Sequence, residues 1–247
     1  MPTAPLILLP PSEGKASGGD GAALDLGSIS FEALNPTRGR MAQALVKMSG
    51  RPRVSRKLLG VKGPALEQAN AENASLETAA TMRAIERYTG VMYSAIGYRS
   101  LDDAARESFA QNVIIMSGLF GAVRPFDMIP AYKLKMGAKL IRNKTCAAVW
   151  KPLISKAFAN EADYGVIWDL LPGEHSAAWD PTTVPHNTRF TVKFAERSTS
   201  GEVKTVTHWS KLLKGALVRH LVENAEAAGS AASASDLAAG FSHPEGY

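Results

Sequence analysis

The sequence predicts a single domain of mixed helix and strand, of the α+β or irregular α/β class. Its 247 residues are 45% apolar, which suffices for one sizeable hydrophobic core. Apolar runs typical of buried strands stand between segments with helical periodicity, and the two kinds of segment follow no regular βα order. The sequence has no internal repeat, so one compact unit spanning residues 1–247 is expected.

Three continuous apolar runs predict buried strands, at residues 6–9, 113–118 and 164–170. The first run stops at two prolines and the second ends in serine and glycine, so both strands should end at loops. Residues 189–194 alternate apolar and polar side chains, which predicts a half-exposed strand, and residues 203–207 fit as its partner.

Helical periodicity or composition marks most of the remaining chain. Residues 91–96 fit either a strand or the end of a helix, and the Ala/Ser-rich tail at 228–236 predicts a loop or linker. Helices are expected at 37–49, 54–70 (two short helices around 60–63), 75–87, 101–112, 151–160 and 210–227.

The charge balance favours acidic partners. Lysine and arginine number 28 against 23 aspartates and glutamates, which gives a formal charge of +5. This modest excess suits nucleic acid, nucleotides or a membrane surface, and equally an ordinary basic enzyme. The N-terminal apolar run is too short for a signal peptide, and no stretch is long enough to span a bilayer. We therefore expect a cytoplasmic protein with no membrane partner.

Cysteine and histidine usage argues against a metal centre. Cys146 is the only cysteine, which excludes an intramolecular disulfide and a cysteine-based zinc site and suits a reducing compartment. It stands in an apolar run, so burial is the expected state, and a redox-sensing thiol is the alternative. The five histidines have no metal-ligand spacing, so we expect no metal site and no cofactor.

Residues 58–66 have the pattern of a helix-hairpin-helix turn. Gly60 and Gly63 permit a tight turn and a close approach to a phosphate, and the helix that follows would offer unpaired N–H groups. No acidic residue stands between Glu32 and Glu67, whereas eight basic residues do: Arg38, Arg40, Lys47, Arg51, Arg53, Arg56, Lys57 and Lys62. The pattern predicts a phosphate-backbone contact independent of base sequence, and the alternative is a helical turn with a solvated basic face. The candidate phosphate-binding residues are Arg53, Arg56, Lys57, Gly60, Lys62 and Gly63.

The loop after the first strand carries Ser12, Glu13 and Lys15. A strand-end loop with glycine and lysine can cradle an anion, although this one is not a P-loop. A lysine in such a pocket can also lose its proton and act as a nucleophile or base. A plain surface turn is the alternative.

The run 117–137 mixes glycines at a strand end with Arg124, Asp127, Tyr132 and Lys133. Arginine can bind a phosphate or carboxylate through two hydrogen bonds, and an aspartate can orient that arginine. A purely structural Arg124–Asp127 pair is the alternative. Lys133 is a further candidate phosphate contact.

Two further groups complete the candidate set. Glu174 and His175 follow the strand at 164–170 and suit acid–base work, although a histidine there is more often a surface residue. Lys211 and Lys214, on the helix at 210–227, either contribute to the same anion-binding cleft or form a solvated basic face.

The run 117–137 resembles the YaaA family, whose members carry a Ser-Gly-Leu-aromatic-Gly-x-x-Arg-Pro-x-Asp segment followed by Pro-Tyr-basic-Leu-x-Met-Gly. Here these are residues 117–127 and 131–137, with Ala131 directly before the tyrosine and Pro130 one residue earlier. The resemblance extends along nearly the whole chain, because residues 10–15, 54–66 and 210–224 and the Gly-Phe and Glu-Gly-Tyr pairs at the C-terminus look like family elements. His175 stands where the family tends to have tyrosine.

The resemblance implies a mixed fold peculiar to the family, with a basic cleft and a helix-hairpin-helix. It also implies binding of duplex, distorted or branched DNA, and protection of DNA under peroxide by limiting free iron. The leading hypothesis is therefore a DNA-binding stress protein.

The rival hypothesis is an enzyme that acts on a nucleobase, a nucleotide or damaged DNA. Polar groups gather after three strands, where α/β enzymes place their active sites. Its candidate catalytic residues are Ser12, Glu13, Lys15, Arg124, Asp127 and Glu174. An iron-handling protein with carboxylate ligands is a third interpretation.

Overall fold

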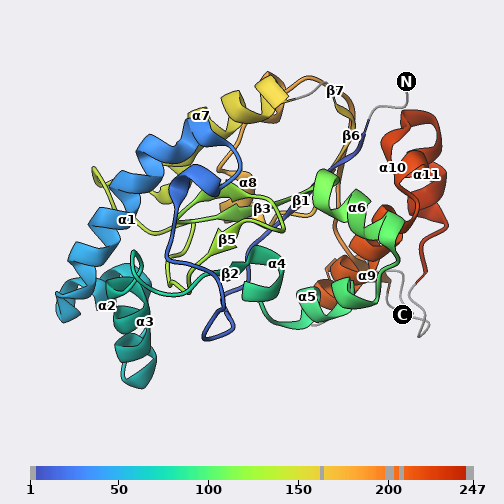
Figure 1. Ribbon diagram of the computed structural model, residues 1–247. Helices are drawn as coiled ribbons and strands as arrows, with labels where there is room; N and C mark the ends of the chain where they lie inside the picture. The colour runs from blue at the N-terminus through green and yellow to red at the C-terminus, as the bar shows by residue number, and fades with distance from the viewer. Residues whose placement is uncertain (1–3, 162–163, 198–202, 206–208, 243–247) are drawn as a thin grey trace.

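A five-stranded sheet with the order β4-β3-β1-β6-β7 forms the centre of the computed structural model, which describes residues 4–161, 164–197, 203–205 and 209–242 (Figure 1). Four strands are parallel and β4 runs antiparallel at one edge. The class is therefore mixed α/β with a mostly parallel sheet. The strands are β1 (Leu6–Leu9), β3 (Val113–Ser117), β4 (Gly121–Val123), β6 (Tyr164–Asp169) and β7 (His186–Thr191).

The apolar runs of the sequence form the three inner strands, as predicted. Every residue of β1, β3 and β6 is buried, because helices cover both faces of the sheet. Ile7 of β1 aligns with Val113 on one side and Trp168 on the other. The carboxyl ends of these parallel strands meet at one margin of the sheet, which we call the carboxyl edge. The loops after β1, β3 and β6 therefore lie along it.

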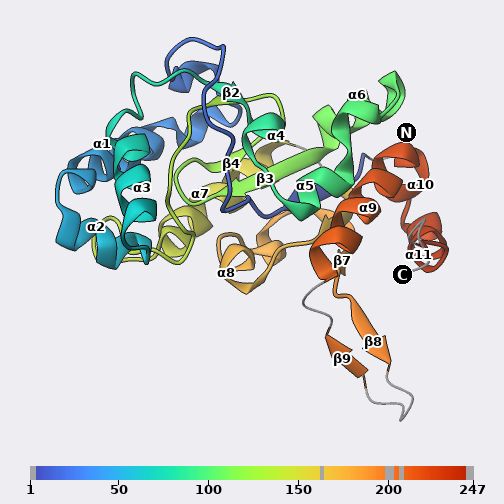
Figure 2. The same cartoon turned by 90° about the horizontal axis from the view of Figure 1, so that it is seen from below.

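Helices pack on both faces of the sheet. The helix α7 (Cys146–Glu161) covers one face of the sheet, and α5 (Val91–Ile96) with α9 (Ser210–Glu223) covers the other (Figures 1 and 2). A Cβ at Gly215 of α9 would lie 2.3 Å from the carbonyl oxygen of Met92, so only glycine permits this close packing. The helix α6 (Asp103–Asn112) leads directly into β3.

Three helices form an extension that we call the hairpin arm: α1 (Asn35–Ser49), α2 (Pro52–Leu59) and α3 (Pro64–Ala74). They lie beside the carboxyl edge (Figure 1). The prediction of two short helices around residues 60–63 is confirmed, whereas their identity as a DNA-binding helix-hairpin-helix stays a prediction.

One arginine of the basic stretch between Glu32 and Glu67 is buried and not on the surface of the protein. Arg38 is fully buried and donates from Nε to the Phe120 carbonyl at 2.9 Å and from Nη2 to the Ala122 carbonyl at 2.7 Å. Arg38 therefore fastens α1 to the sheet and offers nothing to a ligand.

Shorter elements complete the fold. The strands β8 and β9 pair with each other in an antiparallel two-stranded sheet that stands away from the body (Figure 2). The short helices are η1 (Leu26–Ser28), η2 (Glu32–Leu34), α4 (Ala84–Arg87), η3 (Tyr98–Ser100), α8 (Gly173–Ser176), η4 (Pro181–Thr183), α10 (Ala225–Gly229) and α11 (Ala231–Ala239). The short strands are β2 (Met82–Arg83), β5 (Met128–Ile129), β8 (Ala195–Arg197) and β9 (Val203–Thr205).

Two predicted segments differ in the structure. Residues 75–87 are not one helix, because they contain turns, the strand β2 and only the last residues in α4. Thr81 binds the carbonyl of Ala22 through its hydroxyl at 2.7 Å, so tertiary contacts override local helical preference. The tail at 228–236 is not a linker, because most of it lies in α10 and α11; its alanines are the strongest helix formers.

Other boundaries are corrected in detail. Residues 91–96 are helical, and the helix predicted at 151–160 begins at Cys146 with Pro152 inside it. The strand predicted at 189–194 lies three residues earlier, at 186–191, where β7 is parallel to β6, and β9 pairs with β8 rather than with β7. Residues 206–207 of the predicted partner lie outside the described residues. No helix within the described ranges is long and apolar enough to cross a membrane.

Candidate functional site

Lys15 lies in the loop that leaves β1 at the carboxyl edge. It is half-buried, and its ammonium group donates to the Ser12 carbonyl at 3.2 Å. The same nitrogen lies 4.3 Å from the centroid of the Tyr132 ring and 5.3 Å from that of Tyr88. These two rings form the floor on which the lysine rests.

Burial changes the acid–base behaviour of this lysine. It lowers the pKa of Lys15 from 10.5 to about 7, and the charges of Lys133 and Arg87 act in the same direction. Glu72 and Glu13 oppose the shift. A substantial fraction of Lys15 is therefore unprotonated near neutral pH, the form in which an amine is a nucleophile or a base.

A buried chain of hydroxyl groups lies behind the tyrosine rings. The Tyr132 hydroxyl is 2.7 Å from Ser117 Oγ and 2.8 Å from the Tyr88 hydroxyl, and the Phe120 amide donates to Ser117 Oγ at 2.9 Å. Burial raises the pKa of Tyr132 to about 12, so this phenol stays neutral. The chain holds the Tyr132 ring in place under Lys15.

Arg87 fixes the backbone around Lys15. It is fully buried and donates to the carbonyl oxygens of Ala16, Gly18 at 2.8 Å and Ile129 at 3.2 Å. The Ala16 amide in turn donates to the Arg87 carbonyl at 2.8 Å. Sequence reasoning missed Arg87 and Tyr88, because no local pattern connects them with a loop about seventy residues earlier.

Two more lysines are linked to the loop of Lys15 through Glu13. Glu13 pairs through Oε2 with Lys133 at 3.1 Å and through Oε1 with Lys135 at 3.3 Å. We call Lys15, Lys133 and Lys135 the lysine cluster. The backbone of Lys133 is held by Asn73 of α3, which accepts from the Lys133 amide at 2.8 Å and donates to its carbonyl at 3.1 Å. The hairpin arm is thus joined directly to the cluster.

Glu174 and His175 follow β6 at the same edge. Glu174 is exposed and accepts from the Gly137 amide at 3.2 Å. The interpretation of His175 as a surface residue is wrong, because its side chain is only 9% exposed and its Nδ1 has no hydrogen-bond partner. Burial lowers the pKa of His175, which favours the neutral ring.

Asp169 and Lys214 extend this polar margin. Asp169 is buried and accepts from Arg189 Nη2 at 2.6 Å, and Lys214 donates to the Leu170 carbonyl at 2.7 Å. Burial lowers the pKa of Lys214. Lys214 therefore has a structural bond, whereas Lys211 on the same helix is exposed.

Arg124 and Asp127 lie elsewhere. Since β4 runs antiparallel to β3, the residues after β4 return to the amino ends of the parallel strands. There Arg124 pairs with Glu161 at 2.5 Å, and Asp127 accepts from the Ser30 hydroxyl at 2.7 Å and the Arg124 amide at 2.8 Å. The structure does not bring these two residues to Lys15, and they do not form an ion pair with each other.

The hairpin arm presents its cations to solvent. Arg53, Arg56, Lys57 and Lys62 are all exposed. Gly60 and Gly63 adopt positive φ angles of 68° and 58°, and no atom lies within 4 Å of the position that a Cβ would take at either residue. The turn is therefore open to a ligand. A groove of about 530 Å³ separates α1 and α2 from residues 137–143 and is lined by Lys57 and Lys139 among others.

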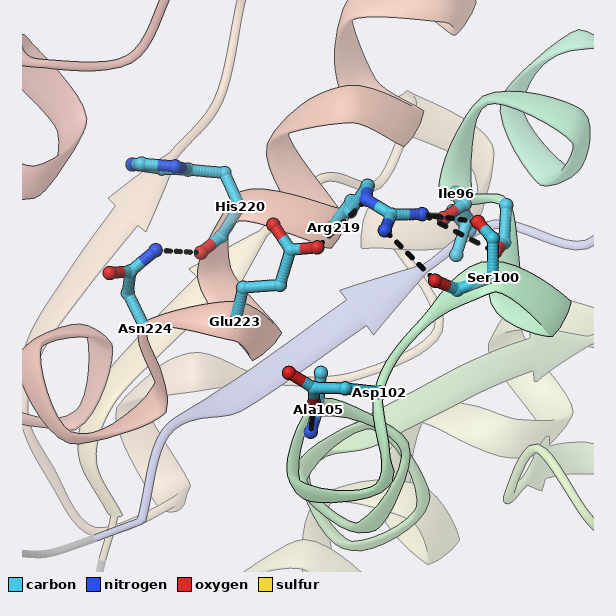
Figure 3. A network of polar contacts seen from close by, with 9 residues as sticks. Ile96, Ser100, Asp102, Ala105, Arg219, His220, Glu223 and Asn224 are labelled. Atoms are coloured by element: carbon cyan, nitrogen blue, oxygen red, sulfur yellow. Dashed lines mark hydrogen bonds and ion pairs between the residues drawn. The ribbon is translucent and has the colours of Figure 1, made fainter.

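Cys146 and Arg219 have structural roles. Cys146 is buried, and burial raises the pKa of its thiol to about 12, so it stays a thiol. Arg219 of α9 donates to Ser100 Oγ at 2.8 Å, which ties α9 to η3, and it pairs with Glu223 of the same helix at 2.8 Å (Figure 3). Among the residues the structure describes, no group of three or more His, Cys, Asp or Glu side chains is placed to hold a metal ion.

Comparisons with known proteins find similarity along most of the chain. A family model described as peroxide stress protein YaaA matches residues 6–241. A UPF0246 protein of Streptomyces coelicolor is 38% identical over 218 residues, which cover 88% of this chain and 82% of that protein. A UPF0246 protein of Corynebacterium efficiens is 37% identical over 240 residues, which cover 95% and 92%.

Proposed function

Because this chain belongs to the YaaA family of peroxide stress proteins, we propose that it binds DNA through the hairpin arm and protects it during oxidative stress. The observation that carries the proposal is the set of exposed cations around an open glycine turn. This set is Arg53, Arg56, Lys57 and Lys62.

The turn between α2 and α3 suits a phosphate for two reasons. Gly60 and Gly63 have no side chains, so a phosphate can reach the backbone. The helix α3 starts immediately after Gly63, and its positive dipole end faces the same place. Pro64 has no N–H, and the Leu66 and Glu67 amides donate to the Gly63 carbonyl at 2.9 and 3.2 Å, so the expected set of unpaired amides is not available and the dipole supplies the attraction. Such contacts ignore base sequence, so the proposal is binding of duplex or distorted DNA through its backbone. Lys133, Lys211 and Lys214 are proposed as secondary phosphate contacts.

The test is a salt-titrated binding measurement with Lys57 and Lys62 both changed to Glu. We expect the affinity for a duplex oligonucleotide to fall by about 10- to 100-fold, and the dependence of log affinity on log salt to flatten by about two units. The matched control is Lys156→Glu with Lys193→Glu, which changes net charge equally at exposed sites outside the arm. An equal loss of duplex affinity in both double variants would show that net charge alone causes it. That result would overturn the proposal that the hairpin arm binds DNA.

The cellular part of the proposal is limitation of free iron during peroxide stress. A deletion strain carrying the Lys57→Glu, Lys62→Glu variant should survive peroxide as poorly as the empty strain if DNA binding provides the protection. Chelatable iron measured in the same cultures separates the two effects. Full survival with the variant would show that protection against peroxide does not require DNA binding by the hairpin arm.

A second candidate function is catalysis by Lys15 on a nucleobase, a nucleotide or damaged DNA. The half-buried amine with a pKa of about 7, held at the carboxyl edge on two tyrosine rings, favours it. Ser12, Glu13 and Glu174 lie along the same edge, whereas Arg124 and Asp127 lie at the other and are not part of this version of the site.

Trapping with borohydride tests the second candidate. The unprotonated Lys15 amine would add to the aldehyde of an abasic site, lose water and form a Schiff base, which borohydride reduces to a stable secondary amine. We expect a covalent protein–DNA adduct with the natural chain and none with Lys15→Met. An adduct of equal yield in Lys15→Met would exclude Lys15 as the nucleophile.

A further inference from the structure

Glu13 is a carboxylate held between two lysines on the surface of the carboxyl edge. Its side chain is 68% exposed, whereas those of Lys135 and Lys133 are 42% and 20% exposed. Both ion pairs are therefore open to water, where such pairs stabilise a structure only slightly. Glu13 can leave this position at little cost.

The lysines themselves stand on a fixed support. Residues 132–136 alternate between buried and outward-facing side chains, as in a strand, and a turn follows in which the Ala138 amide donates to the Lys135 carbonyl at 3.1 Å. Tyr132, Leu134 and Met136 point into the core, and Lys133 and Lys135 point outward. The ammonium groups of these two lysines converge on the two oxygens of the single Glu13 carboxylate.

The third lysine is fixed by other contacts. Arg87 holds the carbonyl oxygens of Ala16 and Gly18, and the Thr89 amide donates to the Gly14 carbonyl at 3.1 Å. The backbone on both sides of Lys15 is thus anchored, whereas the side chain of Glu13 is held by its ion pairs with Lys133 and Lys135.

The charges of the cluster are not balanced. The positive charge of Lys133 is one reason why the pKa of Lys15 is low, and Arg87 adds to it. Glu13 and Glu72 act against the shift and do not cancel it. The rings of Tyr88 and Tyr132, which lie beneath Lys15, are neutral and add no charge. A dianion would neutralise more of this charge than the single carboxylate of Glu13 does.

We propose that Lys15, Lys133 and Lys135 form a binding site for a phosphate group, which Glu13 fills in the free protein and which the ligand opens by displacing that carboxylate. The site deepens the second candidate function, because it would place a phosphate-bearing substrate beside Lys15. It does not depend on DNA binding by the hairpin arm. Since a bound phosphate favours the charged amine, ligand binding raises the pKa of Lys15 and takes up a proton at pH values above 7.

Pyrophosphate titration by calorimetry tests the proposal on the full-length chain. We expect Glu13→Gln to tighten pyrophosphate binding by about three- to tenfold, because the competing carboxylate is gone. The matched control is Glu226→Gln, an exposed glutamate on α10 that adds the same charge and should change affinity by less than about twofold. Equal effects of the two substitutions would overturn displacement by Glu13.

A second variant tests the site itself. Lys133→Gln with Lys135→Gln should weaken pyrophosphate binding by about tenfold or more, with a melting temperature close to that of the natural chain because both side chains reach solvent. Unchanged affinity would overturn the proposal. Repeating the titration in buffers of different ionisation enthalpy reports the proton uptake, and its loss in Lys15→Met assigns it to that lysine.

The source of the phosphate and the independence of the arm are settled by two further titrations. A nucleoside 5′-diphosphate and a duplex with a 5′-terminal phosphate both carry the required group, and the one whose binding tightens in Glu13→Gln identifies the ligand class. The Lys57→Glu, Lys62→Glu variant should keep its pyrophosphate affinity. If that variant loses duplex binding and keeps pyrophosphate, both sites stand. If pyrophosphate binding is lost as well, the cluster is not an independent site.

Discussion

The hairpin arm and the lysine cluster both gather cations beside the carboxyl edge, but they hold them differently. In the arm, Arg53, Arg56, Lys57 and Lys62 are exposed, and within the described ranges none of them pairs with a carboxylate. In the cluster, Lys15 is half-buried on two tyrosine rings, and Lys133 and Lys135 share Glu13.

The difference separates two uses of positive charge. Solvated cations attract a polyanion at long range, release counterions and make binding depend steeply on salt. A partly desolvated lysine instead has an altered pKa, which suits chemistry or the close recognition of one group. The number of basic residues alone does not distinguish the two regions, because burial decides which behaviour a cation has.

The test with the largest expected effect on stability compares two arginines on α1. Arg38 is buried and binds the carbonyl oxygens of Phe120 and Ala122, whereas Arg40 is exposed. We expect Arg38→Ala to lower the free energy of unfolding by about 3 kcal/mol or more, because it leaves buried carbonyl groups without donors. Arg40→Ala should cost less than about 0.5 kcal/mol. Chemical denaturation measures both, and similar costs would show that burial does not separate the two cations.

A second test follows the titration of Lys15. Below pH 7 the folded and unfolded chains both hold this proton, so the full cost of burying the charge is present. Between about 7 and 10.5 the folded chain releases the proton while the unfolded chain keeps it, so stability rises with pH. The slope is at most about 1.4 kcal/mol per pH unit for one proton.

Lys15→Met should remove this rise, and Lys57→Met in the arm should keep it. Denaturation midpoints measured from pH 6.5 to 9.5, expressed as differences from the natural chain, isolate the contribution of Lys15. An unchanged slope in Lys15→Met would show that Lys15 is charged in the folded protein throughout this range.

The smallest effect concerns the backbone of the arm. Gly60 ends α2 with a φ of 68°, whereas Gly50 ends α1 with a φ of −73°. Gly60→Ala should destabilise the protein by about 1 kcal/mol, while Gly50→Ala should be neutral or slightly stabilising. Thermal unfolding of both variants measures the difference. A neutral Gly60→Ala would mean that the turn relaxes easily and does not hold a fixed shape for a ligand.

Much of the sheet could be predicted because its inner strands are buried on both faces. Continuous apolar runs therefore mark β1, β3 and β6 without any knowledge of their neighbours. The helices around Gly60 and Gly63 were equally visible, since glycines punctuate a helical pattern. The segment 75–87 was not, because its hydrogen bonds go to residues near the N-terminus.

The candidate site was predictable only in part. Lys15, Ser12 and Glu13 follow a strand, and such loops of parallel strands share an edge. Arg124 and Asp127 also follow a strand, but β4 is antiparallel and carries them to the other edge. Strand direction is a property of pairing between distant segments, and no local pattern of residues records it.

Residue chemistry along the chain was sufficient to indicate an α/β core, a basic stretch around a glycine turn and a candidate lysine in a strand-end loop. Only tertiary structure decided which cations are buried, since Arg38 and Lys62 stand in the same acid-free stretch and have opposite surroundings. It also placed Tyr88, Arg87 and Asn73 around the lysine cluster. The physical reason is that desolvation and pairing depend on neighbours in space, and for Lys15 and Lys133 those neighbours come from segments far away in the chain.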